Sequence, residues 1–175
     1  MGLIAIDPGV HSMAIAVFED GGILLDAWNE PVSSEGRYPT LADTLTLGWG
    51  LQERLVRRLQ GLVSKHSGIF GERQVSYAGV KGMKIDPNDL IDLAMCSGAF
   101  YGALCAGMGS ILTLVEPAEW KAQVPKDVTR RRIEKLLMGK ELNVIKKGGE
   151  MHNVYDAIGI GLFALGRAKK GMVAP

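Results

Sequence analysis

Cysteine is scarce in this sequence, and what there is cannot form a disulfide. The two cysteines, Cys96 and Cys105, lie nine residues apart in a segment expected to be helical. Because nine residues correspond to about two and a half helical turns, the two side chains point to opposite faces and cannot pair. Two unpaired thiols indicate a reducing compartment, so we expect a cytoplasmic protein.

Long apolar runs and a leader segment are also missing. No stretch approaches the ~20 uninterrupted apolar residues that cross a bilayer. Met1 leads directly into a short apolar run with no basic segment before it. We therefore expect no signal peptide and no membrane partner. The length of 175 residues, 47% of them hydrophobic, suits one soluble domain over residues 1–175.

Net charge is nearly absent, at +1, and does not by itself predict a nucleic acid partner. The charges are nevertheless segregated along the chain. Residues 1–50 hold seven acids and one base, whereas residues 121–147 hold nine bases and three acids. This distribution fits an acidic site beside a basic flank, and it equally fits two solvated surfaces.

Hydrophobic periodicity predicts an α/β fold. Three strands joined by short turns favour an antiparallel meander, and the later alternation of helices and strands completes a mixed five-stranded sheet flanked by helices. The expected strands are 2–7, 12–18, 23–28, 74–80 and 110–116. The expected helices are 47–66, 89–107, 127–138 and 152–169, with loops over 29–46 and 139–150. The small residues of helix 89–107 permit close packing, either on the sheet or on a second copy.

Two acids at opposite ends of the chain could carry chemistry. Asp7 ends the first apolar strand before a Pro-Gly turn, where it either caps the turn or holds a cation. Asp156 lies in an apolar helix, on one face with His152 and Asn153, which precede it by four and three residues. Asn153 could instead cap this helix, with Asp156 favoured by the helix dipole. Paired carboxylates suit Mg²⁺, which supports phosphodiester hydrolysis.

The segments IAIDPGVHSMAIAVF (4–18) and HNVYDAIGIGLFALG (152–166) resemble the first strands and last helix of RuvC-type Holliday junction resolvases, especially phage members. The resemblance implies a ribonuclease H-like fold and an endonuclease of DNA recombination and repair, in a bacterium or a phage-infected host. It implies Mg²⁺, replaceable by Mn²⁺, bound by Asp7, Asp156 and Asn153, with His152 as a neighbouring candidate. It also implies a homodimer on branched DNA, and we expect helices 47–66 and 89–107 to form its interface.

One position departs from this family. Its members carry a glutamate at the end of the fourth strand, and the matching residue of the expected strand 74–80 is Ala78, which cannot bind metal. Either Glu72 or Asp86 substitutes, or the chain is disabled, natively or by deliberate replacement. We favour a replacement because the rest of the site looks intact. We therefore expect junction binding with poor cleavage.

Basic residues for DNA are expected in two regions, although any single one of them is more often a solvated surface residue. They are Lys81, Lys84, Lys121, Lys126, Arg130, Arg131, Arg132, Lys146 and Lys147. Two other functions stay open: a non-catalytic protein that binds branched DNA, and a flap or RNA–DNA hybrid nuclease of the same superfamily. A sugar kinase or actin-like fold is disfavoured because it needs two lobes and a longer chain.

Overall fold

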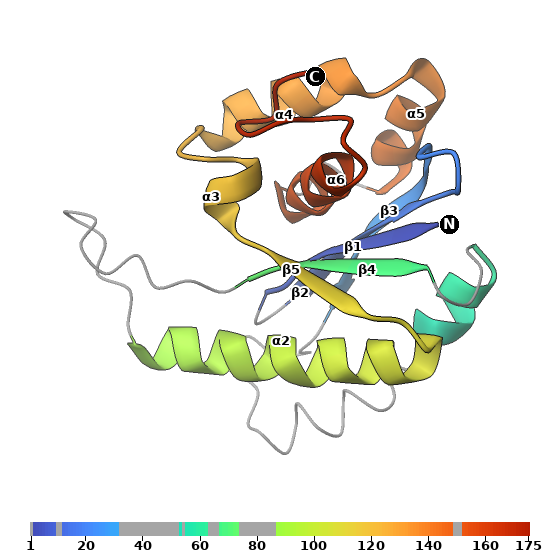
Figure 1. Ribbon diagram of the computed structural model, residues 1–175, viewed down its shortest axis with the longest axis vertical. Helices are drawn as coiled ribbons and strands as arrows, with labels where there is room; N and C mark the ends of the chain where they lie inside the picture. The colour runs from blue at the N-terminus through green and yellow to red at the C-terminus, as the bar shows by residue number, and fades with distance from the viewer. Residues whose placement is uncertain are drawn as a thin grey trace.

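The computed structural model describes residues 2–9, 12–31, 53, 55–62, 67–73, 87–148 and 152–175. Figure 1 shows three layers, with one long helix on one face of a central sheet and a group of helices on the other. This is an α/β architecture, as the sequence predicts.

The sheet has five strands in the order β3-β2-β1-β4-β5, with β1 at its centre. The first three strands are antiparallel, whereas β4 runs parallel to both β1 and β5, so the sheet is mixed. The strands are β1 (Leu3–Asp7), β2 (Ser12–Phe18), β3 (Leu24–Pro31), β4 (Gly68–Glu72) and β5 (Leu112–Val115). The predicted antiparallel meander and mixed five-stranded sheet are confirmed.

The helices divide between the two faces of the sheet. On one face lies α2 (Pro87–Met108), together with a helical segment at residues 55–60. On the other lie α3 (Pro117–Trp120), α4 (Lys126–Leu136), α5 (Gly139–Gly148) and α6 (His152–Ala164). Within the described part of the chain, Leu90–Met108 of α2 is the one helix long and apolar enough to span a membrane, and only 28% of it is buried.

Strand alternation divides the core into two clusters. Leu3 and Ala5 of β1 face α6, whereas Ile4 and Ile6 face α2. Successive strand residues point to opposite faces, so a central strand covered on both sides is apolar throughout. All five residues of β1 are buried, Asp7 included. A carboxylate at the end of such a strand therefore lies at the boundary of the α6 core.

Residues 139–150 were predicted to be a loop, and this prediction is wrong because residues 139–148 form α5. The glycines that suggested a loop stand at the two ends of the helix. Ile145 is buried between them, and Glu141 has no exposed surface. The Glu141 carboxylate accepts hydrogen bonds from Arg167 and from the backbone N–H of Leu24, at 2.7 and 2.8 Å. Tertiary contacts therefore stabilise a helix that composition does not favour.

The fourth strand was predicted at residues 74–80, whereas the strand that joins β1 to β5 is Gly68–Glu72. Two glycines give this segment a low strand propensity. Gly71 is needed there, since a Cβ at this position would collide with the Tyr101 ring. The predicted strand 74–80, with Ala78, lies outside the described residues, so the role assigned to Ala78 stays a prediction; the described strand between β1 and β5 ends at Glu72.

Candidate active site

Asp7 and Glu72 are brought together by the register of two neighbouring parallel strands. Ile6 pairs with Gly71 in this register. The residues that follow them, Asp7 in β1 and Glu72 in β4, therefore lie side by side on the two strands. Asp7 continues the row of Leu3 and Ala5 toward α6. Because parallel strands end at the same edge, both carboxylates emerge at one edge of the sheet.

Helix α6 brings Asp156 to the same edge. The helix packs closely on its neighbours because Gly159 lies against the Trp120 ring and Gly161 against Phe18, positions where a Cβ would collide. Gly9 lies in the turn that follows Asp7, and a Cβ added there would lie 3.9 Å from Asn153 Nδ2. His152 is exposed at the start of the helix. The structure thus brings Asp7, Asn153 and Asp156 together near one turn.

Lys121 lies between the carboxylates. Its Nζ is 3.0 Å from Asp156 Oδ2 and 3.2 Å from Glu72 Oε2. The indole Nε1–H of Trp120 donates to the same Glu72 oxygen at 3.0 Å. These side chains are shielded, with 24%, 15% and 12% of Lys121, Asp156 and Glu72 exposed. One ammonium therefore links acids from β4 and α6 at the mouth of the site.

Burial and mutual repulsion perturb the titration of this cluster. Burial, followed by the charges of Glu72 and Asp156, raises the pKa of Asp7 well above its usual range. Burial also raises the pKa of Glu72, although Lys121 opposes this shift. Burial alone would lower the pKa of Lys121, but Glu72 and Asp156 raise it instead. The acids repel one another and retain the lysine as a cation, as expected where a positive ion is to be bound.

The donor set fits a divalent cation, although the ligands are not yet gathered around one point. Among the described residues, no group of three or more His, Cys, Asp or Glu side chains is close enough to hold a metal ion as it stands. Two of the carboxylates, however, already converge on one positive group, the Lys121 ammonium. Carboxylate oxygens are the ligands that Mg²⁺ and Mn²⁺ prefer. Asp7, Glu72, Asp156 and the side-chain oxygen of Asn153 could supply them.

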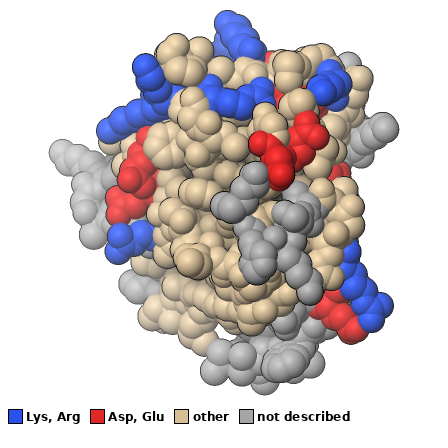
Figure 2. Space-filling view, turned by 45° about the vertical axis from the view of Figure 1, so that its right-hand side comes forward, with Lys and Arg blue, Asp and Glu red and all other residues tan. Residues whose placement is uncertain are grey.

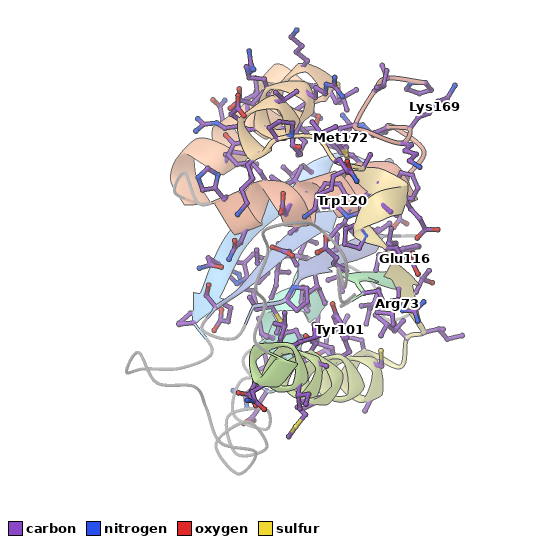
Figure 3. The ribbon with its side chains drawn as sticks, turned by 90° about the vertical axis from the view of Figure 1, so that its left-hand side faces the viewer. Arg73, Tyr101, Glu116, Trp120, Lys169 and Met172 are labelled. Carbon is purple, nitrogen blue, oxygen red and sulfur yellow. The ribbon has the colours of Figure 1, made fainter. Side chains whose placement is uncertain are left out.

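A contact with Tyr101 supports β4 from the opposite face. The Tyr101 hydroxyl donates to the Glu72 carbonyl oxygen at 3.2 Å, and its ring fills the space left by Gly71. Burial, with Asp7 and Glu72 nearby, raises the pKa of Tyr101, so the phenol stays neutral. Figure 3 shows Tyr101 over α2, with Arg73, Glu116 and Trp120 in succession above it. Glu72 is thus held through its backbone from α2 and through its carboxylate from α3.

The residues predicted to contact DNA differ in their distance from the acidic site. Lys126, exposed at the start of α4, lies close enough to lower the pKa of Asp7. Arg130 stacks on the Tyr155 ring and pairs with Glu134, while Arg131 pairs with Asp127 on the surface of α4. Figure 2 shows basic side chains gathered at the upper end of the molecule, where Figure 1 places α4, α5 and the C-terminal segment.

Of the remaining residues predicted to contact DNA, one has a structural role and the side chains of the others are not described. Arg132 donates to the Gly171 carbonyl oxygen at 2.6 Å and anchors the C-terminal segment. The α5 backbone includes Lys146 and Lys147, whose side chains are not described, and Lys81 and Lys84 lie outside the described residues.

Sequence reasoning named Glu72 only as a substitute and assigned Lys121 to DNA alone. A signal for Glu72 was present, since this acid closely follows the apolar pair Ile69-Phe70, as Asp7 follows an apolar run. The two glycines concealed the strand. Nothing in the local sequence of Trp120 and Lys121 indicates that they reach Glu72, because 48 residues separate Trp120 from that acid.

The fold of this chain is similar to that of known structures. No family model matches the chain, and no curated protein matches it significantly. Two solved structures of Thermus thermophilus RuvC are similar to it, one of them in complex with a Holliday junction substrate. They share 15% and 17% sequence identity with this chain, both with a TM-score of 0.58, over 97% of this chain and 99% of theirs. The chain therefore has a ribonuclease H-like fold similar to that of RuvC.

Proposed function

We propose that this protein is an endonuclease that resolves Holliday junctions by hydrolysis of phosphodiester bonds with Mg²⁺, for which Mn²⁺ can substitute. One observation carries the proposal: the carboxylates of Glu72 on β4 and Asp156 on α6 converge on one cation, the Lys121 ammonium, and both acids lie close enough to Asp7 of β1 to raise its pKa. A RuvC of similar fold is known in complex with such a junction. Because Glu72 supplies the carboxylate that Ala78 lacks, we propose a competent enzyme rather than a disabled one.

The roles follow from placement. When bound, the ion would activate water and stabilise charge on the phosphate. Asp7, Glu72 and Asp156 would hold it, with Asn153 as an additional oxygen donor. Trp120 orients the Glu72 carboxylate through the indole N–H. Lys126, exposed beside the acids, would draw the phosphodiester backbone toward them.

The test offers labelled four-way junctions, flaps and RNA–DNA hybrids to the protein in Mg²⁺. We expect paired nicks on opposing strands of the junction near its branch point. Glu72→Gln should lower the cleavage rate by about 10²–10³-fold, the ~3–4 kcal/mol that loss of a charge-stabilising group costs, with junction affinity little changed. Faster cleavage of flaps or hybrids would contradict the substrate assignment. Tight junction binding without cleavage would favour the non-catalytic alternative.

We also propose that the protein acts as a symmetric dimer formed through α2 and β5. Large apolar side chains are exposed on this part of the surface, with Ile91 55%, Met95 39%, Ile111 85% and Leu114 46% exposed. Between them α2 presents Gly98 and Gly102, where an added Cβ would touch nothing. Small residues flanked by apolar ones allow another helix to approach closely. A two-fold dimer would present two equivalent sites to a junction.

The first predicted helix contributes less to this interface. Its described part buries Leu55 and Leu59 and exposes Arg57 and Arg58. The dimer proposal is therefore confined to α2 and the edge strand. Sedimentation should give twice the chain mass for the wild type and the single mass for Met95→Glu. A wild-type monomer at micromolar concentration, or binding of α2 to lipid vesicles in place of self-association, would contradict it.

A further inference from the structure

Lys121 places a positive charge at the point on which the carboxylate ligands of a metal ion would have to converge. Its ammonium contacts two of the three carboxylates, and its charge also acts on the third, Asp7. The same region lacks a ready group of three metal-ligating side chains among the described residues. The two observations are connected, because an ammonium between Glu72 and Asp156 occupies the space into which these carboxylates would converge.

The charges of the cluster agree with this interpretation. Asp7, Glu72 and Asp156 contribute three negative charges when ionised, and Lys121 returns one. Burying like charges together without a counter-ion is costly, so the free protein needs a cation at this position. The Lys121 ammonium supplies this cation from the chain itself. A divalent ion satisfies the same carboxylates more completely, and both cannot take the same oxygens.

The backbone of Lys121 is anchored, and its side chain is the part that can move. The Trp120 carbonyl oxygen accepts hydrogen bonds from the N–H groups of Gly171 and Met172, at 2.8 and 3.2 Å. Ala122 follows in the left-handed region, with φ of 54°, and fixes the end of α3. Figure 3 shows Met172 above Trp120, on the side away from Tyr101. Loss of the lysine contacts therefore requires only rotation of a side chain that is 24% exposed.

We propose that Lys121 is an internal counter-ion that a divalent cation must displace from Glu72 and Asp156, so that metal binding and release of this lysine are coupled. The inference rests on the proposed metal-dependent function and adds a specific competition to it. Without DNA, the lysine weakens metal binding. Once displaced, the ammonium stands at the mouth of the site, where a DNA phosphate can take the place of its lost partners.

The test measures Mn²⁺ binding to DNA-free protein by calorimetry. Lys121→Met should bind Mn²⁺ about tenfold more tightly or better, because the competing charge is gone. Lys140→Met, an exposed lysine of α5, is the matched control and should leave the affinity unchanged. Lys126→Met removes a nearby charge that acts on Asp7 from a distance and should have a smaller effect than Lys121→Met. Unchanged or weaker Mn²⁺ binding by a folded Lys121→Met would overturn the proposal.

A second measurement uses the wild type, so the proposal remains testable if Lys121→Met fails to fold. Titration with diamagnetic Mg²⁺ should shift the ¹⁵N signal of the Lys121 ammonium and speed its proton exchange with water. An unmoved signal at saturating Mg²⁺ would overturn the displacement. Asp7→Asn separates the two levels of inference. If wild type binds Mn²⁺ and Asp7→Asn does not, while Lys121→Met resembles wild type, only the counter-ion proposal fails. If the wild type binds no divalent ion, the metal-dependent function fails as well.

Discussion

Replacing Asp7 by asparagine should stabilise the metal-free protein while it abolishes cleavage. Asp7 is 9% exposed, and burial with two neighbouring acids raises its pKa. Its ionised form therefore destabilises the folded state at neutral pH, by about 1.4 kcal/mol for each pKa unit. One unit corresponds to roughly 3–6 °C in Tm for a domain of this size. Asn keeps the shape and removes the charge, so Asp7→Asn should unfold at a temperature higher by at least that amount.

The pH dependence has a definite sign. Because the folded pKa is raised, the wild type gains stability relative to Asp7→Asn as pH falls through that value, and the gain is complete below the unfolded pKa near 3.9. Thermal unfolding of both proteins in EDTA from pH 7.5 to 4 should therefore show a shrinking difference. With saturating Mg²⁺ the order should reverse, since the ion stabilises only the protein that binds it.

A surface acid provides the control. Asp127→Asn removes an exposed carboxylate paired with Arg131 on α4, and its Tm should change little at any pH. The reasoning is refuted if Asp7→Asn is less stable than the wild type in EDTA at neutral pH, because Asp7 would then be held by a favourable contact. Unimpaired cleavage by Asp7→Asn would remove it from the active site.

Three further perturbations follow from the structure. Arg167→Met should lower the free energy of unfolding by about 3–5 kcal/mol in urea titrations, because Glu141 would stay buried without its charge partner; a loss under 1 kcal/mol would contradict this. The double change Arg130→Gln and Arg131→Gln should weaken junction binding and reduce the slope of log K against log salt by up to ~2; an unchanged slope would exclude α4 from the DNA interface. Gly71→Ala should cost about 1–3 kcal/mol, since a tyrosine ring already fills the space, and it should slow cleavage by shifting the adjacent glutamate; neutral behaviour would show that β4 adjusts freely.

The strands and helices with strong periodicity could be predicted from sequence. Ser12–Phe18 and the apolar run that ends at Asp7 alternate between two buried faces, and their short turns imply antiparallel pairing. The resemblance of the segments around them then suggested that Asp7 and Asp156 share one site. Asp156 was recognisable because an ionisable side chain inside an apolar helix needs a partner.

The rest depended on contacts between distant residues. Gly68–Glu72 forms a strand because β1 and β5 pair with both its edges, although its glycines disfavour one. Residues 139–148 form a helix because Glu141 meets Arg167, 26 residues away. The place of Lys121 among acids likewise follows from the anchoring of α3 by the C-terminal segment. Local propensity contains none of this information, so the sequence placed the third carboxylate position at residue 78 and offered Glu72 only as a substitute.

The shared register of Asp7 and Glu72 fixes the spacing of the two acids. Adjacent strands lie about 4.8 Å apart, so the sheet itself sets the separation of the two acids at their backbones. A single inserted residue in β4 would not merely shift Glu72 along the strand. It would turn the carboxylate to the opposite face, where the described side chains of the α2 core, Tyr101 among them, carry no positive charge. Length changes should therefore be tolerated in the segments around these strands and rejected within them, which would leave substrate choice free to diverge while the spacing of the acids stays fixed.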